Sequence, residues 1–276
     1  MTEHKLVFLA SALALTFAAT AASAQSTFDW TGPYAGVNLG GAFNADTKFD
    51  QTRGDLPNNT NALAQGLRPV EHTVSGKGFT AGAQAGYNYQ FGAFAGGNVV
   101  AGIEADLAYT DLDDTDTLSN TTNIGPLGAP SAVPVTRVNE YRGQLKALGT
   151  VRGRLGLAFD RVFIYGTGGL AYGRVERETI YYGPNAPTTP FFQGSDNGGK
   201  TGYVYGAGFE YAVPDDSPFN MFNSRAVTLK AEYLHYDLGD DTLRFPGVNG
   251  GSEIGGYTSR VATEGDIARV GVNFKF

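Results

Sequence analysis

Residues 79–91 read Phe-Thr-Ala-Gly-Ala-Gln-Ala-Gly-Tyr-Asn-Tyr-Gln-Phe, and this stretch decides the fold class. Every odd-numbered residue in it is Phe, Ala or Tyr, and every even-numbered residue is Thr, Gly, Gln or Asn. Because successive side chains of a β-strand point to opposite faces, one face of this segment is apolar and the other is polar or small. The pattern predicts an amphipathic strand.

The same alternation recurs along the rest of the chain. It is clear in residues 99–109, 145–159, 203–211, 227–233 and 268–276. Two further segments, 35–43 and 162–175, are less regular, and the alternation in 162–175 does not distinguish its two faces. Together with residues 79–91, these segments predict eight strands.

The gaps between the expected strands alternate in length. Short gaps are 92–97, 159–161 and 213–224, and the long polar ones are 44–78, 110–143, 177–200 and 239–266. Short turns on one side and long loops on the other are typical of outer-membrane barrels, whereas a soluble sandwich would leave open edges. We therefore expect an all-β fold, an eight-stranded antiparallel up-and-down transmembrane β-barrel with long extracellular loops.

Composition and charge exclude several other classes. The 276 residues include 39 Gly, 34 aromatics, three His and no Cys, which argues against a disordered chain, a disulfide scaffold and a zinc domain. With 20 basic against 27 acidic residues, the net charge is −7, so we expect no nucleic-acid partner.

The N-terminus carries the features of a secretory signal. His4 and Lys5 precede an apolar run over residues 6–19, and Ala22-Ser23-Ala24 has the small-x-small pattern of a cleavage site. The run is short for a membrane anchor, which would need about 20 residues. We expect a signal peptide at 1–24 and the barrel at 25–276, exported to the cell outer membrane.

The polar faces of the strands carry charges that must avoid lipid. A Lys or Arg facing lipid at mid-membrane costs about 2–4 kcal/mol, so these faces are expected to line the lumen. The interior of an eight-stranded barrel is only wide enough for side chains, which favours a packed, salt-bridged lumen over an ion pathway. The predicted lumen residues are Glu104, Asp106, Lys146, Arg152, Arg154, Glu210, Lys230, Glu232 and Arg269, with Lys275 on the same face of the last strand.

Three segments together resemble a known family. They are Trp30-Thr31-Gly32-Pro33-Tyr34-Ala35-Gly36, the run from Gly149 to Gly173 that includes Val151-Arg152-Gly153-Arg154-Leu155-Gly156, and the ending Ala268 to Phe276. The chain resembles the alphaproteobacterial outer-membrane immunogenic proteins, OmpA-like eight-stranded barrels often labelled "porin family".

The resemblance implies a surface barrel with structural and host-contact roles and no catalytic residues. Sometimes the family is linked to haem, but no dedicated ligand set is visible, because His72 lies alone in the first long gap; we expect no cofactor. The resemblance also implies that Phe274 and Phe276 belong to a C-terminal signal read by the barrel-assembly machinery. Expected partners are membrane lipid and lipopolysaccharide, with a host or surface ligand at the loops.

Other functions are weaker readings of the sequence. A narrow porin is the first alternative. A hydrolase at the barrel rim is the second, since His235 lies near Asp237 and near the acidic residues 111–116, but no serine is fixed beside it by a motif. Residues 111–116 lack the glycine and glutamate of an EF-hand, so they do not match a calcium-binding loop. Gly166-Thr167-Gly168-Gly169 lies in an expected strand rather than before a helix, so it does not match a phosphate-binding loop.

Overall fold

The computed structural model describes residues 28–64, 66–124, 130–214, 224–249 and 255–276, so the predicted signal peptide lies outside the described part. No helix among these residues is long and apolar enough to cross a membrane. The elements are β1 Gly32–Gly54, α1 Pro57–Ala64, β2 Glu71–Phe94, β3 Gly97–Ile124, β4 Pro130–Phe159, β5 Val162–Gly183, β6 Ala186–Ala212, β7 Ala226–Pro246 and β8 Gly256–Lys275.

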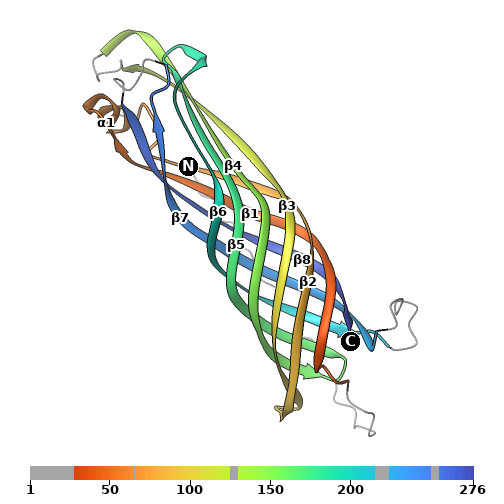
Figure 1. The fold of residues 1–276 in the computed structure, drawn as a ribbon. Helices are drawn as coiled ribbons and strands as arrows, with labels where there is room; N and C mark the ends of the chain where they lie inside the picture. Colours follow the sequence, from red (N-terminus) through yellow and green to blue (C-terminus); the bar gives the residue numbers. More distant parts are fainter. Residues whose placement is uncertain (1–27, 65, 125–129, 215–223, 250–254) are drawn as a thin grey trace, which may run out of the picture.

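The strands form one closed ring in chain order. Each strand pairs antiparallel with the next, and β8 returns to pair with β1, so Val37 lies opposite Val272. Figure 1 shows the strands tilted around a common axis, with the C-terminus and the short turns at one end and α1 at the other. The prediction of an eight-stranded antiparallel up-and-down barrel is confirmed.

The strands are much longer than the sequence pattern predicts. Most residues of the four gaps expected as long loops belong to strands. For example, β3 runs to Ile124 and β4 begins at Pro130. The alternation stops being visible there because, beyond the membrane, the outer face of a hairpin contacts water and no longer selects apolar residues. The long excursions are therefore mainly extended hairpins, with α1 between β1 and β2.

The turns at the other end are tight. β2 and β3 are joined through Ala95 and Gly96, both of which have positive φ, and β4 and β5 through Asp160, also with positive φ. Two-residue connections of this kind match the twist of paired strands. The short gaps predicted at 92–97 and 159–161 are thus hairpin turns.

The outer wall carries an apolar belt between two aromatic rings. The belt contains Val37, Leu39, Ile103, Leu107, Val151, Leu155, Leu170, Leu229 and Val270, all exposed. The ring nearer the short turns contains Tyr87, Tyr89, Phe91, Phe159, Phe209, Tyr211 and Phe276, and the ring nearer the long hairpins contains Phe43, Phe79, Tyr109, Tyr172, Tyr203, Tyr205 and Tyr233. Such girdles mark the two membrane interfaces of outer-membrane barrels.

Backbone pairing follows the same boundary. The β6–β7 ladder runs from Ala212 to Tyr203, which belongs to the ring nearer the long hairpins. Beyond Tyr203, no ladder pair of the described residues joins β6 and β7 before the isolated bridge between Phe192 and Gly247. In this interval the side chains of Lys200 and Asp241 connect the two strands. An open ladder is tolerated where water can satisfy the backbone but not in lipid.

The interior is filled in four successive layers, and β4 passes through all of them. Ala158 belongs to an apolar cluster around Trp30 and Phe163 at the short-turn end. Arg154 and Arg152 follow in a charged layer. The next two layers are an aliphatic cluster, which on β4 includes Leu148 and Leu145, and an aromatic cluster, which includes Tyr141, Tyr181, Phe245 and Tyr257.

This fold predicts β-sheet circular dichroism for the purified mature chain and a gel mobility that changes on boiling. The closed ladder keeps the barrel compact in SDS until heat breaks all of its strand pairs together. Far-ultraviolet spectra and paired boiled and unboiled lanes provide the measurement. A helical spectrum in detergent would contradict the assignment.

A second prediction concerns the C-terminus. Phe276 is 54% exposed on the outer wall, and its N–H donates to the carbonyl of Pro33 at 3.0 Å, so it lies where the ring closes at the short-turn end. Deleting Phe276 should lower the amount of barrel in the outer membrane while export continues. Fractionation and immunoblotting measure both, with Phe91→Ala, another exposed aromatic of the same ring, as a matched control. Equal membrane levels of the deletion variant and the intact protein would refute an assembly role.

Candidate functional site

Eight of the nine predicted lumen residues lie together in one buried layer. They are Glu104, Asp106, Glu210 and Glu232, and Arg152, Arg154, Lys230 and Arg269, each at most 8% exposed. The layer therefore holds four acidic and four basic side chains, and its formal charges cancel. Strand alternation puts all of them on the inner face of β3, β4, β6, β7 and β8.

Arg152 is the centre of this layer. Its guanidinium bonds Glu104 at 2.5 Å and Asp106 at 2.9 Å through Nη2, and Glu232 at 3.0 Å through Nη1. Its Nε donates to Thr150 Oγ1 at 2.9 Å, which uses the remaining edge of the fork. One side chain of β4 thus joins carboxylates from β3 and β7.

Arg154 extends the layer toward the short-turn end. It bonds Glu104 at 3.1 Å and Glu210 at 2.5 Å, and its guanidinium lies 4.0 Å from the centre of the Tyr165 ring. A cation over an aromatic face gains electrostatic attraction in addition to its ion pairs. Arg154 thereby couples the charged layer to the apolar cluster around Trp30 and Phe163, which includes Tyr165.

Lys230 and Arg269 complete the ring of contacts. Lys230 Nζ lies 2.6 Å from Glu104 and 3.3 Å from Glu232. Arg269 lies 3.0 Å from Asp106 and 2.7 Å from Glu232. Every acid of the layer except Glu210 is therefore shared among at least two bases, so the charges form a network rather than separate pairs.

Neutral polar side chains satisfy the remaining lone pairs. Tyr34 donates to Glu104 at 2.8 Å and Tyr165 to Glu232 at 3.0 Å, while Asn273 donates to Glu210 at 2.8 Å. Thr150 and Thr228 also donate to carboxylates of the layer. The sequence interpretation missed these partners. Strand alternation alone nevertheless places Tyr34 on the inner face of β1, because its neighbours Ala35 and Val37 lie on the lipid-facing side.

Two glycines make room for the tyrosines. A Cβ at Gly86 would lie 2.4 Å from the hydroxyl of Tyr34, and one at Gly208 would lie 2.3 Å from the hydroxyl of Tyr165. These positions must lack a side chain so that each ring can cross the lumen and reach its carboxylate. The glycines on the inner face are therefore part of the packing of the charged layer.

Lys146 does not join the layer, contrary to the prediction. The β4–β5 pairing shifts between Leu145 and Ala147, so an extra residue on β4 reverses which face follows. Leu145, expected on the lipid side, is 3% exposed inside the barrel, and Lys146 points outward to Glu176 at 2.5 Å. Lys275 is buried but lies lower, where Nζ donates to the carbonyl of Trp30.

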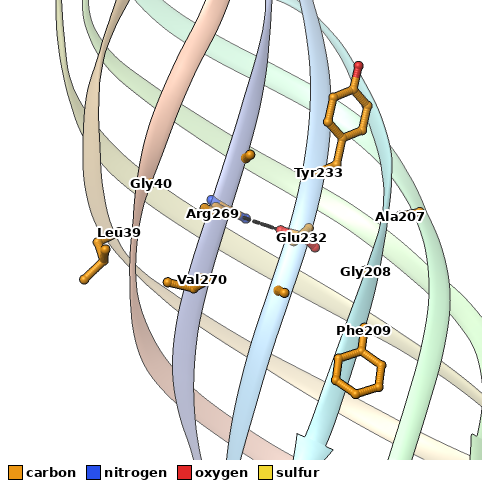
Figure 2. A pocket seen from close by; sticks show the side chains of 11 residues that line it. Leu39, Gly40, Ala207, Gly208, Phe209, Glu232, Tyr233, Arg269 and Val270 are labelled. Atoms are coloured by element: carbon orange, nitrogen blue, oxygen red, sulfur yellow. Dashed lines mark hydrogen bonds and ion pairs between the residues drawn. The ribbon is translucent and has the colours of Figure 1, made fainter. Parts of the chain in front are cut away.

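Residues next to one another on β7 and β8 show the two faces directly. In Figure 2, Arg269 and Glu232 are joined by an ion pair, while their neighbours Tyr233 and Val270 belong to the outer face. The pocket in Figure 2 is also lined by Leu39, Phe209 and Ala207, of which Leu39 and Phe209 are exposed on the outer wall. It is a depression in the lipid-facing wall and not an opening along the axis.

His235 lies among the aromatic residues of the girdle nearer the long hairpins. Its Nδ1 lies 2.9 Å from Asp266 Oδ1, and its ring packs 5.0 Å from Tyr205. The carboxylate beside it is thus Asp266 on β8, which the sequence interpretation missed, whereas Asp237 accepts from Tyr203 at 2.9 Å. Among the described residues, no serine or threonine is hydrogen-bonded to the His235 ring.

The structure places His72 and residues 111–116 in strands, whereas the sequence predicts long loops there. His72 lies in β2, where its ring centre is 4.6 Å from that of Tyr141 and its Nε2 is 2.9 Å from Asp116 Oδ2. Residues 111–116 belong to β3 rather than to a loop, and Asp113 bonds Arg142 at 2.9 Å. That hydrogen bond lowers the pKa of the Asp113 carboxyl. The long hairpins place His72 beside Tyr141 and Asp113 beside Arg142. The shorter strands predicted from the sequence do not reach these residues.

Comparisons with solved structures give low overall similarity. Ail, the attachment invasion locus protein of Yersinia pestis, is 12% identical with a TM-score of 0.30, covering 87% of this chain and 99% of that one. The outer membrane protease OmpT of Escherichia coli is 10% identical with a TM-score of 0.39, covering 92% and 99%. At these scores neither likeness supports a statement about this chain.

Sequence comparisons are more informative. The 31 kDa outer-membrane immunogenic proteins of Brucella melitensis biotype 1 and Brucella suis biovar 1 are each 31% identical over 259 residues, which cover 94% of this chain and 88% of theirs. A family model described as the outer membrane protein beta-barrel domain matches residues 10–276. The chain therefore belongs to the outer-membrane β-barrel family and is similar over most of its length to the Brucella immunogenic proteins.

Proposed function

We propose that this outer-membrane barrel has a structural and surface-interaction role and that its lumen is a packed, salt-bridged plug. The observation that carries the proposal is the balanced layer of four acids and four bases centred on Arg152. Buried charges are tolerated when each is paired and hydrogen-bonded, and a network of this kind fills the space that a solute would need.

The other interior layers support the same function. Below the charges, Trp30, Phe163 and Tyr165 pack in one cluster, and above them Leu145 and Leu234 pack in another. A hydrated ion would have to cross both apolar layers as well as the charged one. A narrow porin, the alternative reading of the sequence, would require these clusters to separate.

A non-enzymatic role agrees with the geometry at the rim. His235 is held by Asp266, but the dyad faces the membrane interface among aromatic rings and has no hydroxyl nucleophile from the described residues. The relatives are named as immunogenic outer-membrane proteins. The hydrolase hypothesis therefore has two elements of a triad, His235 and Asp266, and no nucleophile beside them among the described residues.

The partners follow from the two ends of the barrel. The apolar belt contacts membrane lipid, and the aromatic ring nearer the long hairpins would meet lipopolysaccharide. The hairpins of β1–β2, β3–β4, β5–β6 and β7–β8 extend past that ring and offer the surface for a host or other external ligand. The barrel-assembly machinery is the expected partner of the C-terminal strand with Phe274 and Phe276.

Arg152→Ala tests the packed lumen. The substitution leaves Glu104, Asp106 and Glu232 without their shared base, and breaking a buried pair in this way costs about 3–5 kcal/mol. Arg142→Ala is the matched control on the same strand, because its pair with Asp113 is 43% and 49% exposed and exposed pairs contribute about 0–1 kcal/mol. Urea unfolding in lipid vesicles, followed by gel mobility, measures both variants. Equal stability losses in the two variants would defeat the packed-lumen proposal.

Conductance distinguishes the plug from a porin. In planar bilayers the intact protein should show only small and rare openings, since four successive layers of side chains fill the lumen. Arg152→Ala should increase the frequency of openings by loosening the charged layer. If instead the intact protein conducts steadily and Arg152→Ala alters ion selectivity without changing opening frequency, the porin reading would replace the plug.

A further inference from the structure

A buried arginine links the segment after α1 to β4 and β5. Arg68 lies in the segment that follows α1 and is only 3% exposed. Its Nη1 donates to Asn139 Oδ1 at 2.6 Å, its Nη2 donates to the carbonyl of Tyr182 at 2.8 Å, and its guanidinium lies 4.6 Å from the Tyr181 ring centre. These contacts fix the guanidinium inside the aromatic layer, but none of them neutralises its charge.

A second buried arginine lies on β4 beside it. Arg137 is 5% exposed and two residues from Asn139, on the same inner face of the strand. Its Nη1 has no hydrogen-bond partner among the described residues, and neither has Nδ2 of Asn139, whose oxygen is used by Arg68. Two unused donors therefore lie on adjacent inward positions of one strand.

Acidic groups that could balance these arginines are placed elsewhere. No carboxylate of the described residues forms an ion pair with Arg68 or Arg137. Glu140, the next residue after Asn139, faces the other side and accepts from the Tyr182 hydroxyl at 2.9 Å. Burial, followed by repulsion from Arg68, lowers the pKa of Arg137, and burial likewise lowers that of Arg68. In a chain with more acids than bases, this pairing of unneutralised cations contrasts with the balanced layer in the membrane.

We propose that Arg68, Arg137 and Asn139 form a binding site for one tetrahedral oxyanion, a phosphate or sulfate group, at the extracellular end of the barrel. The ligand chemistry follows from the donors, since two guanidiniums and an amide supply only N–H groups and a dianion neutralises both cations. Arg presents a rigid fork that suits this geometry. The group would be either a free ion or the substituent of a surface sugar, so the site rests on and deepens the proposed surface-interaction role.

Equilibrium dialysis of the refolded mature barrel with radiolabelled sulfate or phosphate, at low chloride concentration, tests the site. The intact protein should bind one ion per barrel, and Arg137→Gln should weaken binding at least tenfold. Arg260→Gln is the matched control, because Arg260 is an exposed arginine of the extracellular part that pairs with Asp240 at 2.7 Å. Gel mobility before and after boiling confirms that each variant has folded.

Thermal unfolding gives an independent readout. Sulfate should raise the midpoint of the intact protein and of Arg260→Gln, because a ligand that binds only the folded state stabilises it, and it should leave Arg137→Gln unchanged. Without sulfate, Arg137→Gln should be at least as stable as the intact protein, since the variant loses an unpaired buried charge. No stoichiometric binding of either ion by the intact protein, or binding by Arg137→Gln equal to that of the control, would overturn the proposal.

Competition identifies the source of the group. Glucose 6-sulfate that displaces labelled sulfate at lower concentrations than unlabelled sulfate indicates a sugar-borne ligand, and displacement only at equal or higher concentrations indicates the free ion. Both results support the site. Its failure would leave the lumen proposal intact, because Arg152→Ala tests a layer on the other side of the aliphatic cluster.

Discussion

Ring closure between β1 and β8 is the constraint on which the rest of the structure depends. Lipid offers no hydrogen bonds, so a strand that spans it must be paired on both sides, and only a closed sheet does this for every strand. Closure gives each strand an outer face toward lipid and an inner face toward the lumen. Val37 opposite Val272 lies on one such face, while Asn38 opposite Gly271 lies on the other. The apolar belt and the charged layer are consequences of the same pairing.

The small interior of the barrel then decides how its charges are used. Glu104 and Arg152 sit opposite each other in the β3–β4 register, and Glu232 and Arg269 do so in β7–β8. Opposite positions in a ladder bring side chains into direct contact, and the narrow lumen lets Arg152 reach across to Glu232 as well. The charges therefore contact one another directly, which is the physical basis for the proposal that they pack the lumen rather than form a pathway.

The fold and the content of the charged layer were predictable from the sequence because lipid selects strictly. In residues 99–109 the odd-numbered side chains are apolar and point outward, so the even-numbered Glu104 and Asp106 must point inward. Lys146 was not predictable in this way, since a bulge of one residue reverses the faces and leaves no mark in a pattern of Leu, Lys and Ala. Residues 162–175 were ambiguous because Tyr165 and Phe163 point inward while Ile164 and Leu170 point outward, so both faces carry large side chains.

Beyond the aromatic ring nearer the long hairpins, selection acts on one face only. The outer wall there meets water and carries polar residues such as Asp113 and Arg142, so the alternation that reveals a membrane strand disappears although the strand continues. The inner wall stays buried, and Tyr141, Tyr181 and Tyr257 fill it. Neither lipid nor strand register requires a buried charge without a partner in this layer. The unneutralised Arg68 and Arg137 cost folding energy that the aromatic packing must offset, and a bound anion would remove that cost.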